Sequence, residues 1–159
     1  MLDERLFTRK LLENEQILYR ISCGLLRSEA DRKDAMQETA LKAWQYMGSL
    51  RNEAAFKTWI IRILINECRA IWRKSSREIP MNHLPEPAAQ DQTDPELRML
   101  LESLPEKQRV PIVLHYLEGF SLNEIAAVQH TSLSMVKYRM NQARKALRVT
   151  LEGKETEIK

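Results

Sequence analysis

Apolar residues recur at the spacing of an α-helix through the first half of the chain. The first such set consists of Leu11, Leu18, Ile21, Leu25 and Leu26. It predicts one amphipathic helix, which Gly24 weakens slightly. A second helix is expected to begin after Ser28 or Asp31 and to end at Gly48. Its expected core face is formed by Met36, Ala40, Ala43, Trp44 and Met47.

A third helix is predicted from about Ala54 to Lys74, ending before Ser75 and Ser76. Its expected buried residues are Phe56, Ile60, Ile63, Leu64 and Ile71. Because the three helices each present an apolar face, they can share one hydrophobic core. The first half of the chain is therefore expected to form one helical domain.

Residues 78–95 break this pattern, since they hold four of the six prolines together with several acidic groups. Such a composition is typical of a flexible, extended linker. Beyond it, Ser103 and Glu106 have the spacing of a capping box, with Pro105 in the first turn of the helix that they predict. Pro111 removes a backbone donor from that helix, and a kink is expected near Lys107–Pro111.

A second capping box, Ser121 to Glu124, predicts another helix start, with Phe120 placed to pack on Ile125. That helix is short and is followed by a polar turn, His130 to Ser132, and by a longer basic helix. The longer helix is expected from Leu133 to about Leu147. A short helix, a tight turn and a basic helix form a helix-turn-helix.

The predicted fold class is all-α, with two small helical domains joined by a flexible linker. The low glycine content and the 43% hydrophobic residues agree with this class. The expected boundaries are 1–77 for the N-terminal domain, 78–95 for the linker and 96–159 for the C-terminal helix-turn-helix domain.

Charge is distributed unevenly along the chain, although its net value is only +3. Residues 51–77 hold seven basic and two acidic groups, residues 78–103 hold one and six, and residues 104–159 hold nine and six. Two basic blocks separated by an acidic stretch indicate two surfaces that meet polyanions.

Several classes of protein are excluded by what the chain lacks. No apolar run approaches 18 residues and no signal peptide is evident, so a cytoplasmic protein without membrane insertion is expected. Cys23 and Cys68 are far apart and are expected to be buried free thiols. His83, His115 and His130 have no ligand partners at metal-binding spacing, and no catalytic motif is present. We therefore expect no metal, no cofactor and no enzymatic activity.

The third predicted helix carries a stripe of polar and aromatic residues opposite its isoleucines. The stripe consists of Trp59, Arg62, Asn66, Arg69 and Arg73. These residues are three or four positions apart, so they lie on one side of the helix, and Lys57 and Arg77 extend the charge of the stripe. Arginines contact phosphates, an aromatic ring stacks on an unpaired base, and Asn can read a base edge. The stripe favours single-stranded or melting DNA; the alternative is a solvated helix face with a partly buried Trp59.

The last helix combines charge with hydrogen-bonding groups, as a helix in the major groove would require. Its cations are Lys137, Arg139, Arg144, Lys145 and Arg148, and its polar groups are Ser132, Ser134, Tyr138, Asn141 and Gln142.

The second predicted helix carries one apolar residue, Leu41, among the polar residues Asp34, Gln37, Glu38 and Gln45. This set is a candidate protein-binding patch, although single exposed leucines are common.

An ordered series of short segments resembles the extracytoplasmic-function sigma factors of bacterial RNA polymerase. The segments are DAMQETALKAW at 34–44, FKTW at 56–59, LPEKQR at 104–109, GFS at 119–121, EIA at 124–126, VK at 136–137 and AR at 143–144. The resemblance implies a protein that binds polymerase core, directs it to promoter DNA and promotes opening of the duplex without nucleotide hydrolysis. It also implies an anti-sigma factor as a partner, often membrane-anchored.

The resemblance assigns roles to three sets of residues. Polymerase binding would use Asp34, Gln37, Glu38 and Leu41. A loop at 48–55 would capture a flipped base of the minus-ten element, and the opened strand would contact Arg51, Lys57, Trp59, Arg62, Asn66, Arg69 and Arg73. The minus-thirty-five duplex would be read by Ser132, Ser134, Lys137, Tyr138, Arg139, Asn141 and Arg144.

The chain departs from the family pattern at His130, where a turn glycine is usual, and at Ser134 and Met135, where glycine and threonine are usual.

Two other functions are alternatives to that of a sigma factor. One is a stand-alone helix-turn-helix regulator, which would bind palindromic DNA without polymerase. The other is a helical interaction protein without a role at nucleic acid.

Overall fold

The computed structural model describes residues 2–77 and 94–158, with side-chain environments for 2–75 and 94–152. Every regular element in these residues is a helix, as predicted. The chain divides into two compact units, Met1–Asp91 and Gln92–Lys159, and each is described by itself.

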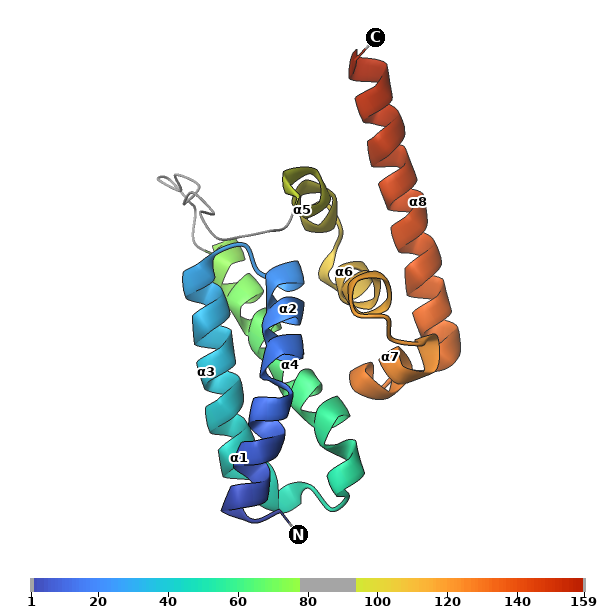
Figure 1. The fold of residues 1–159 in the computed structure, drawn as a ribbon. Helices are drawn as coiled ribbons and strands as arrows, with labels where there is room; N and C mark the ends of the chain where they lie inside the picture. The colour runs from blue at the N-terminus through green and yellow to red at the C-terminus, as the bar shows by residue number, and fades with distance from the viewer. Residues whose placement is uncertain (1, 78–93, 159) are drawn as a thin grey trace. The chain divides into compact units, whose positions relative to one another are not determined.

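The N-terminal unit is built from four α-helices and two short 3₁₀ helices. In order they are α1 (Glu4–Glu13), α2 (Glu15–Leu25), α3 (Glu29–Tyr46), the 3₁₀ helices Met47–Ser49 and Glu53–Ala55, and α4 (Phe56–Arg77). Helix α3 packs along α4, and α2 lies against both (Figure 1). Trp72 fixes the far end of α4 by donating from Nε1 to the carbonyl of Leu25 at 2.9 Å.

The prediction of a single first helix is wrong, because the chain forms two helices that meet at Asn14. The Asn14 side chain donates to the carbonyl of Lys10 at 2.8 Å, so it competes with continuation of the helix. The extra helix α1 buries Phe7, whose ring lies 5.5 Å from the ring of Trp44 and 6.0 Å from that of Phe56.

The core face of α3 also differs from the predicted one. Its buried residues are Arg32, Ala35, Thr39 and Ala43, whereas Trp44 is 44% exposed and Met36 and Ala40 are half-buried. Arg32 is satisfied in the core because it donates to the carbonyls of Leu26 and Arg27 at 3.1 and 3.2 Å. Two polar residues with internal partners thus occupy positions that an apolar pattern cannot identify.

Helix α4 supplies more buried apolar residues to the core of this unit than any other helix. Its buried apolar residues are Phe56, Ile60, Ile61, Leu64, Ile65 and Cys68, while Ile63 and Ile71 are only half-buried. The helix begins at Phe56, after the 3₁₀ turn, and continues past Ser75 to Arg77, so the predicted stop was wrong. Cys68 is buried as expected, but Cys23 is partly exposed.

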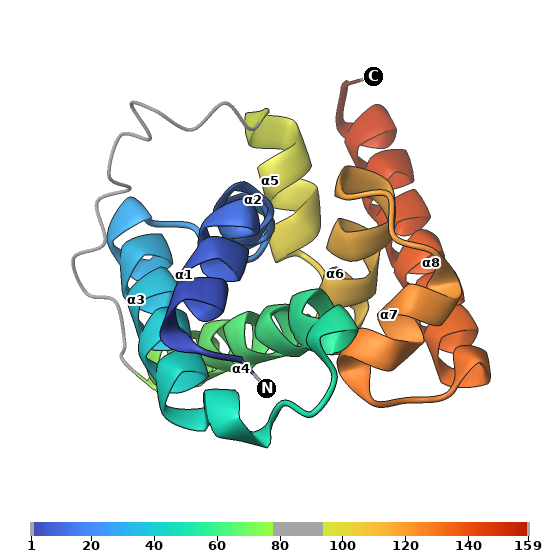
Figure 2. The ribbon, with the colours of Figure 1, turned by 60° about the horizontal axis from the view of Figure 1, so that its bottom comes forward.

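The C-terminal unit consists of α5 (Pro95–Glu102), α6 (Glu106–Ile112), a π-helical segment (Val113–Leu117), α7 (Leu122–Gln129) and α8 (Leu133–Ile158). Helices α6 and α7 pack against α8. Their shared core includes Val110, Leu114, Ile125, Val128, Val136 and Met140. Figure 2 shows α7 and the start of α8 joined by a short connection, as the sequence predicted.

Helix α5 was missed, and the predicted end of the linker changes with it. Asp94 caps α5 by accepting from the amide of Glu96 at 3.0 Å, and Pro95 is the first helical residue. Asp94 and Pro95, which the predicted linker included, therefore form the start of α5, and residues 78–93 lie outside the described part of the chain. The capping box at Ser103 is absent, because Ser103 instead donates to the carbonyl of Leu100 at 2.6 Å.

The second capping box is confirmed. Ser121 Oγ accepts from the Glu124 amide, the Glu124 carboxylate accepts from the Ser121 amide, and both bonds measure 3.1 Å. Helix α6 runs through Pro111 and changes to π-helical geometry at Val113. His130 takes the left-handed conformation with φ of 50° and ends α7. Helix α8 extends well beyond its predicted end near Leu147.

Candidate nucleic-acid interface

The stripe on α4 is only partly exposed. Asn66 and Arg73 are exposed, as is Lys57, whereas Trp59, Arg62 and Arg69 are half-buried. The Trp59 ring lies 5.7 Å from the ring of Phe56, tilted by 51°. Burial also lowers the pKa of the Arg62 guanidinium. One side of Trp59 is therefore held by the core, which fixes the direction of its remaining face.

The connection that precedes α4 is the predicted base-capturing loop at 48–55. Arg51, Asn52 and Glu53 are exposed there. Asn52 accepts a hydrogen bond from the amide of Ala54 at 3.0 Å, and this bond starts the 3₁₀ turn that leads into α4. The loop thus presents Arg51 next to the beginning of the stripe.

The outer face of α3 carries the predicted protein-binding patch. Asp34, Gln37 and Glu38 are exposed, and Leu41 is 57% exposed. Trp44 lies one turn after Leu41 and adds a second exposed apolar side chain, whereas the apolar pattern predicts it in the core. Its spacing of three residues from Leu41 was the signal that could have identified it. Two apolar side chains flanked by carboxylates are typical of a protein interface.

The N-terminal part of α8 forms the second cationic surface. Ser132 caps the helix by accepting from the Met135 amide at 3.1 Å. All but one of the residues predicted for this surface are exposed, and Arg139 is half-buried; the exposed ones are Ser132, Ser134, Lys137, Tyr138, Asn141 and Arg144. Because α7 packs against α8, the turn at His130 to Ser132 leaves the first turns of α8 open to solvent.

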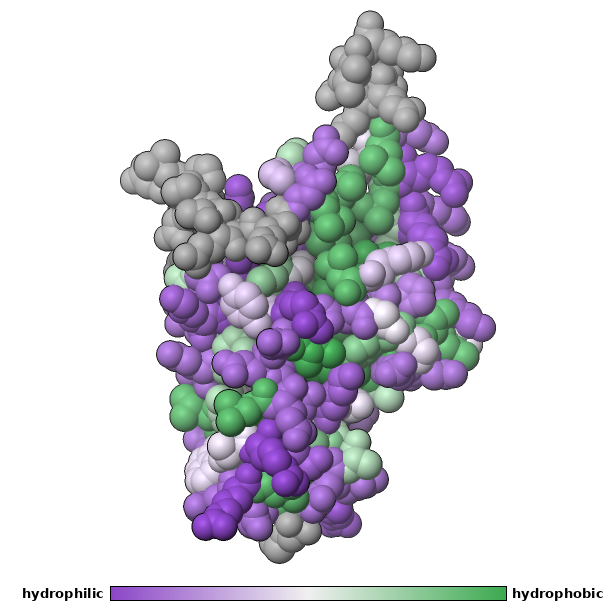
Figure 3. All heavy atoms as spheres, in the orientation of Figure 1, coloured by the Kyte–Doolittle hydropathy of each residue, from purple (hydrophilic) through white to green (hydrophobic). Residues whose placement is uncertain are grey.

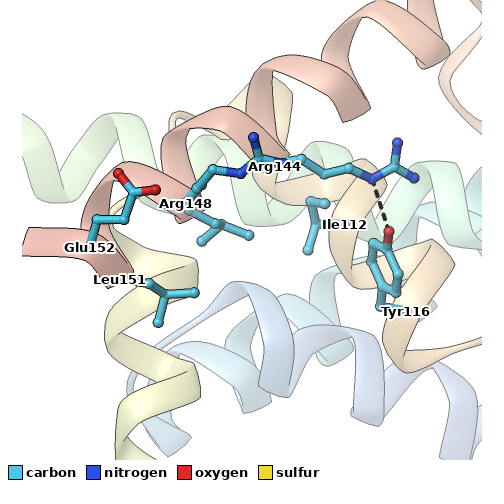
Figure 4. A pocket seen from close by; sticks show the side chains of 7 residues that line it. Ile112, Tyr116, Arg144, Arg148, Leu151 and Glu152 are labelled. Atoms are coloured by element: carbon cyan, nitrogen blue, oxygen red, sulfur yellow. Dashed lines mark hydrogen bonds between the residues drawn. The ribbon is translucent and has the colours of Figure 1, made fainter. Parts of the chain in front are cut away.

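Arg144 is held by side chains on both sides, as Figure 4 shows in part. Its Nε donates to the hydroxyl of Tyr116 at 3.0 Å, and its Nη1 donates to Oδ1 of Asn141 at 3.3 Å. The guanidinium also lies 6.0 Å from the centre of the Tyr116 ring, within range of a cation–π interaction. Tyr116 was not predicted, since it comes from the π-helical segment far away in the sequence.

Arg144 and Tyr116 also line one end of a shallow groove that continues along α8. Its lining includes Ile112, Leu147 and Leu151, with Arg148 and Glu152 at its edge (Figure 4). In Figure 3, apolar surface gathers along α8 on this side, while the opposite side of the helix is hydrophilic. Helix α8 is therefore divided into an apolar side and a polar, cationic side.

The described residues show neither a metal-binding cluster nor a helix suited to a membrane. Residues 2–77 and 94–158 contain no cluster of three His, Cys, Asp or Glu side chains that could hold a metal ion. Among the helices assigned there, none is both long and apolar enough to span a membrane.

Comparison with protein families identifies both units. The model of Sigma-70 region 2 matches residues 11–78, and that of Sigma-70, region 4 matches residues 95–147. The RNA polymerase sigma factor SigV of Bacillus subtilis is 25% identical over 146 residues, covering 89% of this chain and 88% of the relative. The ECF RNA polymerase sigma-E factor of Escherichia coli K12 is 31% identical over 137 residues, covering 74% of this chain and 72% of the relative.

Solved structures agree with these relatives. The sigma factor RpoE, in its complex with the anti-sigma factor NepR from Bartonella quintana, superimposes with a TM-score of 0.74 at 27% identity, covering 92% of this chain and 96% of RpoE. CnrH, in complex with the cytosolic domain of CnrY, has the same fold, with a TM-score of 0.70 at 23% identity, covering 95% of this chain and 90% of that chain. Both matched domains, the relatives and the folds therefore place this chain in the extracytoplasmic-function family of RNA polymerase sigma factors, non-enzymatic initiation factors that direct the polymerase to promoters.

Proposed function

We propose that the three surfaces described above divide the work of initiation between the two units. The outer face of α3 binds polymerase core, the stripe on α4 with Arg51 holds the unpaired minus-ten strand, and the start of α8 reads the minus-thirty-five duplex. The observation that carries this proposal is that each of the three sets has exposed members on a helix of its own.

Polymerase binding by α3 rests on the chemistry of its patch. Exposed Leu41 and Trp44 offer apolar area, and Asp34 and Glu38 offer charges that can pair with basic residues of a protein partner. Carboxylates would repel DNA phosphates, so this face suits a protein better than promoter DNA.

The test of this face is binding of the full chain to purified RNA polymerase core. Replacing Asp34, Glu38 and Leu41 together by Ala is expected to weaken binding at least about tenfold, because an apolar anchor and its flanking charges are lost together. The matched control replaces Glu4, Glu15 and Leu12 by Ala, which removes two exposed carboxylates and an exposed leucine elsewhere in the unit. Equal binding of the two triple variants would contradict the assignment, and no binding by the unsubstituted chain would favour a stand-alone regulator.

Strand capture by α4 is tested separately, with promoter opening as the measurement. Asn66→Ala and Trp59→Leu are expected to reduce opening, detected by permanganate reactivity of unpaired thymines, while core binding stays unchanged. Leucine at position 59 keeps an apolar contact with Phe56 but removes the ring that stacks on a base. Unchanged opening in both variants would exclude this role.

Regulation by an anti-sigma factor is part of the same proposal. RpoE was solved with the anti-sigma factor NepR, and CnrH with the cytosolic domain of CnrY. For this chain we propose a cytoplasmic location, where polymerase core is found, and a partner that masks the α3 patch. A protein of this kind would compete with core for the unsubstituted chain, and would bind the α3 triple variant less well than the control variant.

A further inference from the structure

Two large side chains with mainly apolar surface stand exposed at the start of α8. Met135 is 41% exposed and Tyr138 is 59% exposed, and they lie three residues apart, one turn along the same side of the helix. Neither position is needed for the core, which α8 supplies through Val136, Met140 and Ala143. The exposure of these two side chains thus requires another explanation.

The polar groups around them indicate what could cover them. Ser134 and Asn141 lie on the same side of α8, while Lys137 and Arg139 fall on opposite flanks of it, because successive helical residues are about 100° apart. An apolar centre bordered by cations on both flanks matches the major groove, in which base edges lie between two phosphate backbones. A protein surface or a lipid would not require cations on both flanks.

The backbone holds the two side chains in place before any ligand arrives. Ser132 caps the first turn of α8 through the Met135 amide, and the left-handed His130 fixes the preceding turn. Met135 is therefore at the capped end of the helix, where the recognition helix of a helix-turn-helix contacts bases.

We propose that Met135 and Tyr138 read thymine methyl groups in the minus-thirty-five duplex. The C5-methyl of thymine is the apolar group that base edges present in the major groove, and a thioether or an aromatic ring can cover it without leaving a polar atom unpaired. Promoters of this chain therefore carry A·T pairs with thymine facing these positions. The inference rests on the proposed reading of duplex DNA by α8.

The experiment separates the methyl group from the rest of the base. Holoenzyme assembled from core and the full chain selects bound promoters from a library randomised in the minus-thirty-five element, and each thymine of the selected element is then replaced by deoxyuridine. Uracil keeps the hydrogen-bonding edge and lacks only the methyl. At one or two positions, replacing thymine by uracil is expected to lower the affinity of the holoenzyme for the promoter about fourfold. This ratio corresponds to the burial of one methyl group.

The variants assign that loss to a side chain. Met135→Ser is expected to bind thymine and uracil equally at one of these positions, and Tyr138→Ser at the same or the adjacent one. Tyr138→Phe keeps the ring and is expected to keep the preference. Val149→Ser, at an exposed apolar position further along α8, should change neither affinity nor preference.

The inference would be overturned if the unsubstituted holoenzyme tolerated uracil at every position, or if the preference for thymine over uracil survived in both serine variants. Either result would leave the proposed reading of the duplex by α8 intact. If selection enriches no sequence in the element, the proposed function of α8 itself fails, and this inference fails with it.

Discussion

The ammonium group of Lys42 on α3 donates a hydrogen bond to Oε1 of Glu67 on α4, where Glu67 is 8% exposed. The contact joins the helix proposed for polymerase binding to the helix proposed for strand capture. Lys42 lies next to Leu41, and Glu67 lies next to Asn66. The pair therefore fixes the register between two functional faces of the N-terminal unit.

Removal of Lys42 is expected to destabilise this unit. In Lys42→Ala the Glu67 carboxylate stays largely buried without the ammonium, which should cost about 1–2 kcal/mol. All three tryptophans, Trp44, Trp59 and Trp72, belong to the N-terminal unit, so urea unfolding followed by tryptophan fluorescence reports on it alone. Lys33→Ala, at an exposed position on α3, is the control, and equal midpoints for the two variants would exclude the predicted contribution.

The same pair predicts a dependence of stability on pH. The hydrogen bond to Glu67 raises the pKa of Lys42. A raised lysine pKa contributes stability that is fully present below the unfolded value of about 10.4 and is lost as pH rises through the higher folded value. The difference in unfolding free energy between the unsubstituted chain and Lys42→Met should stay constant from about pH 6 to about pH 9 and shrink above about pH 10.4. A difference that grows with pH would contradict it.

Thiol reactivity should distinguish the two cysteines. Burial raises the pKa of Cys68 to about 12, so at pH 8 this residue is almost entirely a protonated, inaccessible thiol. Iodoacetamide is expected to modify the partly exposed Cys23 in the native protein, and Cys68 only after unfolding in urea. Peptide mass spectrometry measures both sites in one sample. Equal rates under native conditions would show that the core around Cys68 opens readily.

Salt dependence should reveal which cations of α8 contact phosphates. Arg144→Gln and Lys137→Gln are each expected to lower the slope of log affinity against log salt by about one for the holoenzyme on its promoter. Tyr116→Phe removes the acceptor that orients Arg144 but no charge. It should therefore lower affinity by about threefold and leave the slope unchanged. A changed slope in Tyr116→Phe would show that Tyr116 does more than orient the guanidinium.

The parts of the fold that the sequence predicted correctly depend on local contacts. The box of Ser121 with Glu124 and the turn that ends at Ser132 involve neighbours within a few residues, and both are present. The core face of α3 was wrong because Arg32 is satisfied by carbonyls outside the helix, in the connection from α2. The capping box predicted at Ser103 is absent for a similar reason, since its hydroxyl donates to the carbonyl of Leu100, one turn earlier.

The candidate site was predictable where helical spacing alone decides exposure. Asp34, Glu38 and Leu41 on α3, and Ser134 and Lys137 on α8, are exposed as expected; their roles remain proposals. Spacing could not reveal that Phe7 packs on Trp44 and Phe56, or that Tyr116 binds Arg144 across 28 positions of sequence. Contacts of that kind depend on how helices pack, which no local pattern records.

The length of α8 offers a practical advantage for measuring promoter engagement. Ile158, at the end of the helix, lies 24 positions after Ser134, or about 36 Å away at a rise of about 1.5 Å per residue. The family match ends at residue 147, so the last turns lie beyond the matched domain. A fluorophore attached near the end of α8 would therefore sit at a distance suited to energy transfer from a labelled duplex, without occupying the face proposed to read it.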